Sequence, residues 1–143
     1  MHDKRVEKKR NMKNKIINLT KENAGFLDQM YETPDTLVVR IDGSKINSWK
    51  EYIEALDPFI HFPDDCTDDA DRYHDWMTDL EWLGKKAYVV IIDHYSALMK
   101  NDLRDKKLVY EIFEEDILPF FHDEVEYVVG PGRKKPFNVY LVD

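Results

Sequence analysis

Blocks of apolar residues along this chain predict strands that are separated by helices. Thr36 to Gly43 is short, rich in β-branched residues and closed by Asp-Gly, which is typical of a strand. Ala87 to Asp93 is almost continuously apolar, as a strand buried on both faces should be. Val125 to Val129 and Phe137 to Val142 are two further candidates, with a turn-forming segment of Gly, Pro and basic residues between them. We predict that these last two strands form an antiparallel hairpin.

Helical periodicity fills the intervals between the strands. A capping box at Ser48 and Glu51 begins a helix that runs to about Leu56. A second helix is predicted over about Asp69 to Leu80, and a third over Asp105 to Phe121. The order strand, two helices, strand, helix, strand predicts an α/β protein in which helices connect parallel strands.

The first 36 residues are predicted to be an N-terminal extension, and residues 37–143 the main domain. The extension begins with a basic segment that has no apolar stretch behind it, so it is not a secretory signal. Its composition favours a disordered tail. Leu19 to Tyr31 is a weak helix candidate, which Gly25 interrupts.

The stretch from Phe62 to Trp82 is the most unusual part of the chain, because carboxylates crowd around a single basic residue, Arg72. On a helix, an apolar stripe forms the core-facing side: Tyr73, Trp76, Met77 and Leu80. The opposite side is mostly acidic: Asp68, Asp71, Asp75, Thr78 and Asp79. Like charges four residues apart destabilise a helix by a few tenths of a kcal/mol per pair, so local stability does not explain this face. A cationic partner would explain it.

Composition narrows the classes of partner and compartment. The chain has 143 residues, 43% of them hydrophobic, which suits one domain with a real core. Its net charge of −8 makes a nucleic-acid backbone a poor direct partner and a basic protein a good one. The single cysteine, Cys66, excludes an intrachain disulfide and fits a reducing, cytoplasmic compartment. No apolar run approaches the length of a membrane span.

A set of short motifs accompanies the order of elements from about Leu37 onward: Asp42-Gly43, Phe62-Pro63, Asp71, Asp75 and Asp79-Leu80-Glu81-Trp82. Together they resemble the barstar family of ribonuclease inhibitors. The resemblance covers roughly three quarters of the chain. It implies a small α/β fold of the barstar type, with helices packed on a mostly parallel sheet of three strands plus an optional antiparallel C-terminal strand. It also implies a cytosolic immunity protein that blocks the active site of a basic ribonuclease toxin, is not an enzyme, needs no cofactor, and is monomeric when free.

The resemblance carries over residue by residue. In the family, the second helix and the loop before it enter the nuclease cleft, and Asp75 matches the aspartate that occupies the substrate-phosphate site. Asp71, Thr78 and Glu115 match other contact positions. His74 stands where the family has a tryptophan. The full set of expected partner-binding residues is Asp65, Asp68, Asp71, His74, Asp75, Thr78, Asp79 and Glu115.

The acidic stretch also admits other readings. It could be a solvated surface, or a carboxylate-based metal-binding or enzymatic domain, since Asp71, His74 and Asp75 have ligand spacing on a helix. No second ligand cluster is evident, the calcium-loop glycine is missing, and acidic neighbours disfavour the thiolate of Cys66, so we predict no metal site and no catalytic thiol. An inhibitor predicts an exposed, convex acidic helix, whereas an enzyme predicts the same carboxylates in a concave site.

Overall fold

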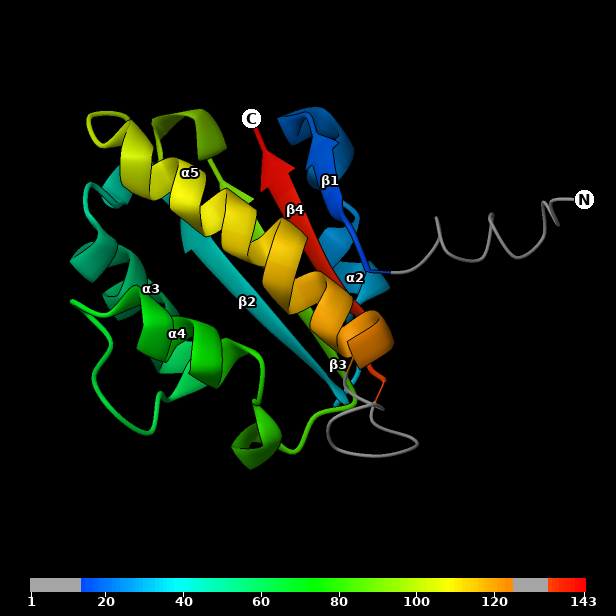
Figure 1. Cartoon of the computed structure of the whole chain (residues 1–143). Coiled ribbons are helices and arrows are strands. Elements are labelled where there is room, and N and C mark those ends of the chain that lie inside the picture. Colours follow the sequence, from blue (N-terminus) through cyan, green and yellow to red (C-terminus); the bar gives the residue numbers. More distant parts are fainter. Residues whose placement is uncertain (1–13, 125–133) are drawn as a thin grey trace, which may run out of the picture.

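Four parallel strands form the sheet at the centre of the structure, in the order β1-β4-β3-β2 (Figure 1). The computed structural model describes residues 14–124 and 134–143. The predicted α/β class, with a parallel sheet covered by helices, is confirmed. The strands are β1 (Ile16–Leu19), β2 (Thr36–Asp42), β3 (Ala87–Asp93) and β4 (Phe137–Val142).

The C-terminal strand corrects one prediction. β4 lies between β3 and β1 and pairs in parallel with both, so an antiparallel arrangement is wrong for this strand. The reason is that β4 is apolar on both sides: Val139 and Leu141 join the larger core, while Tyr140 and Val142 join the smaller one. Such a strand belongs in the interior of a sheet. The expected hairpin partner, Val125 to Val129, lies outside the described residues.

The N-terminal segment corrects a second prediction. Instead of one weak helix over Leu19 to Tyr31, the chain forms strand β1, a 3₁₀ turn η1 (Lys21–Ala24) and the single-turn helix α2 (Leu27–Met30). Ile16 of β1 lies opposite Val139 of β4. The sheet therefore includes residues that precede position 37, the predicted start of the main domain.

Three helices cover one face of the sheet, and η1 with α2 covers the other (Figure 1). The two helices between β2 and β3 are α3 (Trp49–Ile60) and α4 (Ala70–Met77). Between β3 and β4, α5 (Leu103–Glu111) continues into two π-helical segments, η5 (Ile112–Ile117) and η6 (Phe120–Glu124). Short 3₁₀ turns complete the described chain: η2 (Gly43–Lys45), η3 (Glu81–Leu83) and η4 (Tyr95–Ala97).

The ends of α3 and α4 differ from those predicted. The capping box at Ser48 begins α3 as expected, but the helix continues past Pro58 to Ile60, which is only 1% exposed. His61 then ends α3 in the left-handed conformation, with φ of 53°. In contrast, α4 stops at Met77, because the chain turns and Leu80 adopts a φ of 60°.

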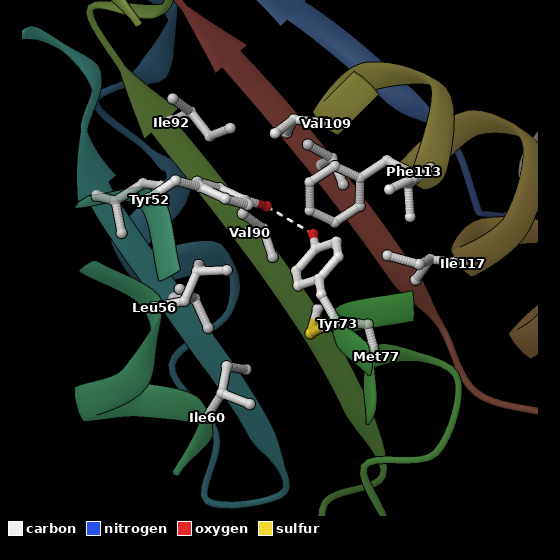
Figure 2. Close-up of a cluster of buried hydrophobic side chains, with 14 of the residues drawn as sticks. Tyr52, Leu56, Ile60, Tyr73, Met77, Val90, Ile92, Val109, Phe113 and Ile117 are labelled. Carbon is white, nitrogen blue, oxygen red and sulfur yellow. Dashed lines mark hydrogen bonds between the residues drawn. The ribbon is translucent and has the colours of Figure 1, made fainter. Parts of the chain in front are cut away.

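The predicted apolar stripes meet in the larger core (Figure 2). Tyr73 and Met77 of α4 point toward α3 and β3, and neither is exposed. The Tyr73 hydroxyl lies 2.6 Å from that of Tyr52 on α3, and this buried pair joins the two helices. Val109, Phe113, Ile117 and Phe121 are also buried, as the spacing of the third helix predicts. The core therefore fixes α4 from its inner side.

Among the described residues, no helix combines the length and apolarity that a membrane span requires.

Candidate partner-binding surface

The sequence of α4 fixes both its start and its orientation. The Asp69 carboxylate caps the helix by accepting a hydrogen bond of 3.0 Å from the Arg72 backbone N–H. Asp71 lies in the first turn, where the helix dipole favours a negative charge. Because Tyr73 and Met77 are buried, the carboxylates of Asp71 and Asp75 are left on the solvent side.

Arg72, the single basic residue of the acidic stretch, forms contacts within the molecule. Its Nη1 donates a hydrogen bond of 3.1 Å to the Asp65 carbonyl and lies 3.4 Å from the Asp64 carboxylate. Its Nε lies 3.9 Å from the carboxylate of Asp69. The guanidinium thus ties the loop before α4 to the helix, and it neutralises the carboxylates at the helix start rather than those farther along.

The loop over residues 61–69 is further ordered by its own side chains. The Asp65 carboxylate accepts a hydrogen bond of 2.9 Å from the Thr67 N–H, and this bond is the main reason that the pKa of Asp65 is lowered. The Trp49 indole donates to the Cys66 carbonyl at 3.0 Å and anchors the loop to α3. A loop held in this way loses little conformational freedom when a partner binds it.

Four carboxylates on α4 and next to its two ends are exposed to solvent. The side chain of Asp75 is 80% exposed. Asp68, Asp71 and Asp79 are also exposed, and within the described ranges no ion pair engages any of the three. Asp71 and Asp75 lie on α4, Asp68 precedes its N-cap, and Asp79 follows its C-cap. We call this set the acidic strip, formed by Asp68, Asp71, Asp75 and Asp79.

Two predicted residues lie beyond the helix rather than on its face. Thr78 is the half-buried C-cap residue of α4. Its hydroxyl donates a hydrogen bond of 2.8 Å to the His74 carbonyl, which closes the helix. Asp79 follows Thr78 and accepts a hydrogen bond of 3.1 Å from the Glu81 N–H. Asp75 and Asp79 are consequently not a helical i,i+4 pair, although both remain exposed.

His74 connects α4 to the π-helical segment η5. Its Nδ1 lies 3.6 Å from Asp75 Oδ1, and its Nε2 lies 3.7 Å from Asp116 Oδ2. Glu115, the residue of this helix that was predicted to contact the partner, is exposed beside Asp116. Asp116 was missed by the sequence analysis, and the acidic run Glu114-Glu115-Asp116 was the one available signal. A 3.6-residue period does not reveal which of the three faces α4, since η5 is a π-helix.

The acidic strip lies apart from the cavities that are best formed among the described residues. Five of the best-formed cavities along the described chain are lined by residues outside the range 62–82. Among the described residues, no group of three or more His, Cys, Asp or Glu side chains is placed to hold a metal ion. Cys66 is buried, and its burial, followed by nearby carboxylates, raises the pKa of its thiol to about 11. The thiolate that nucleophilic chemistry requires is therefore strongly disfavoured.

Comparison with known proteins decides the family. The family model described as Barstar (barnase inhibitor) matches residues 36–141. This chain belongs to the barstar family. The matched range starts at β2 and reaches β4, so β1, η1 and α2 precede the part that defines the barstar family. Neither the comparison with curated proteins nor the comparison with solved structures gave a match.

Membership of the barstar family supports a general role as an inhibitor of barnase-type ribonucleases. The acidic helix named in the sequence analysis, α4, lies within the matched range, as does Glu115. Which residues contact a ribonuclease remains a prediction.

Proposed function

We propose that this barstar-family protein is an immunity protein that blocks the active site of a basic ribonuclease toxin. The loop over residues 61–69 and α4 enter the nuclease cleft, and the acidic strip takes the place of RNA phosphates. The observation that carries the proposal is the family match over residues 36–141, joined to an exposed row of carboxylates on a helix that the core holds in place.

Asp75 is the central group of the proposed interface. Its side chain is 80% exposed and lies in the second turn of α4, so it can reach a lysine or arginine of the nuclease without a change of backbone. Charge-assisted hydrogen bonds to such cations are the strong ones, and a rigid element loses little entropy in forming them. Asp71, one turn earlier, supplies a second carboxylate.

The remaining predicted residues surround this centre. Asp65 and Asp68 lie in the loop before α4, on the side of the surface that precedes the helix. Thr78 and Asp79 extend the surface past the end of α4, and Glu115 extends it onto η5. Charges at such a rim contribute mainly to steering and less to affinity.

A metal-binding or enzymatic role is the alternative for the same carboxylates. An enzyme would hold them in a concave, partly desolvated site. The exposed position of Asp75 and the location of the cavities elsewhere favour an inhibitor. We propose further that the protein acts in the cytoplasm as a monomer, where it meets the toxin before RNA is cleaved.

The test is inhibition of RNA hydrolysis by two nucleases: barnase, and a ribonuclease identified by co-purification with this protein from its own cells. A pancreatic-type ribonuclease, which is also basic but has a different active site, serves as the control. The proposal predicts stoichiometric inhibition of at least one of the first two and none of the control. Uninhibited hydrolysis by both would refute it, and equal inhibition of all three would indicate non-specific charge attraction.

A further inference from the structure

His74 occupies an unusual position, because its two ring nitrogens face carboxylates from different helices. Asp75 belongs to α4, and Asp116 belongs to η5. The His74 side chain is 40% exposed and that of Asp116 is 43% exposed, so both side chains are accessible to solvent. The three side chains form one line from the centre of the acidic strip to the neighbouring helix.

The protonation state of the imidazole decides how many hydrogen-bond donors His74 offers to the two carboxylates. A neutral imidazole has one N–H and one lone pair, so one of the two carboxylates faces a lone pair. The imidazolium has a donor for each carboxylate. Histidine as a residue type changes charge between pH 5 and 8, which is the physiological range.

Further carboxylates lie near His74 in the sequence of α4 and of η5. Asp71 lies one turn earlier on α4, and Glu115 adjoins Asp116 on η5. Arg72 is the nearest cation in sequence, and its guanidinium is engaged by the loop before the helix. A positive charge on His74 therefore lies between the carboxylates of Asp75 and Asp116.

We propose that protonation of His74 turns the partner-binding surface off. This inference rests on the proposed function, since it concerns the same surface. The imidazolium attracts Asp75, the carboxylate that the nuclease must bind, and adds a positive charge where a basic partner brings its own. The neutral imidazole leaves Asp75 and Asp116 to the partner. Formation of the complex consequently favours loss of a proton from His74, and affinity falls as the solution becomes more acidic.

The experiment compares how affinity responds to pH in three inhibitors: wild type, His74→Gln, which cannot become charged, and His74→Arg, which is always charged. The dissociation constant for a barnase-type ribonuclease that the wild type inhibits is measured at pH 5.5 and pH 7.5. The nuclease's own titration is common to all three, so it cancels when the ratios of the two constants are compared. Binding linked to one proton changes affinity by up to about tenfold per pH unit.

The ratio compared is the dissociation constant at pH 5.5 divided by that at pH 7.5. We expect this ratio to be at least about fivefold larger for wild type than for either His74 variant. His74→Arg should bind more weakly than His74→Gln at both pH values. Asp116→Asn, which removes one of the two flanking carboxylates, should give a smaller pH response than wild type. Thermal melts of all variants check that the fold is retained. Equal ratios for wild type and His74→Gln would overturn this inference while leaving the proposed function intact. A wild-type protein that inhibits no ribonuclease would refute the proposed function and this inference with it.

Discussion

Replacement of Asp75 by alanine separates a binding role from a structural one. In the unbound protein the carboxylate is 80% exposed, and its contact of 3.6 Å with His74 is a surface pair worth about 0–1 kcal/mol. Alanine has a higher helix propensity than aspartate, by roughly 0.5 kcal/mol. The substitution also removes a negative charge near the C-terminal end of α4 and its repulsion with Asp71, each worth about 0.3 kcal/mol. We expect the free energy of unfolding to stay the same or to rise slightly.

The affinity for the nuclease, in contrast, should fall in the Asp75→Ala variant. Truncation of one partner in a buried, hydrogen-bonded charge pair costs about 2–5 kcal/mol, and the central position of Asp75 favours the upper part of that range. We expect a loss of at least about 3 kcal/mol, which is more than about a hundredfold in affinity. Barstar itself is the standard measured example of such a central aspartate, so this magnitude is carried over from the family rather than worked out from this structure.

The assay is binding calorimetry with the inhibited ribonuclease, together with thermal melts of the same samples. Glu54→Ala is the matched control, because it removes one exposed negative charge from a different helix, α3. It should change affinity by only a small factor. The reasoning is refuted if Asp75→Ala binds like wild type, if it melts far below wild type, or if Glu54→Ala weakens binding equally.

Three further predictions follow from charge and burial. The rate of association with the nuclease should fall steeply as ionic strength rises past 0.1 M, because the Debye length there is about 10 Å; a salt-independent rate in stopped flow would argue for apolar docking. Tyr73→Phe should cost about 1–3 kcal/mol in urea melts, since it leaves the buried Tyr52 hydroxyl without its partner, and the double variant with Tyr52→Phe should lose less than the single one. Hydrogen bonds from Ser44 and then His94 lower the pKa of Asp42 from 3.8 to about 2, so the contribution of Asp42 to stability is present above pH 3.8 and lost as pH falls to about 2. Asp42→Asn should flatten that part of the profile of unfolding free energy against pH. An unchanged profile would contradict the assignment.

Elements with strong local signals could be predicted from the sequence. β3 is buried on both faces, as its continuous apolar run indicates, and Ser48 caps α3 through the Glu51 N–H as the capping box requires. The buried side of α4 was predicted from the spacing of Tyr73 and Met77, because helical periodicity reports burial directly.

Features that depend on distant partners could not be predicted. Ile16 to Leu19 is a strand only because β4 offers an unpaired edge more than a hundred residues away in sequence. The parallel direction of β4 likewise depends on its pairing with β1 and β3, which are distant in sequence. The contact between His74 and Asp116 depends on the π-helical geometry of η5, which no periodicity in the sequence encodes.

The most direct test of the account is competition between this protein and RNA for the ribonuclease. Initial rates of hydrolysis are measured over a range of RNA concentrations at several fixed inhibitor concentrations. If the acidic strip occupies the place of substrate phosphates, the apparent inhibition constant rises in proportion to RNA, and saturating RNA restores the full rate. Inhibition that persists unchanged at saturating RNA would show that the protein binds elsewhere on the nuclease and would contradict the account.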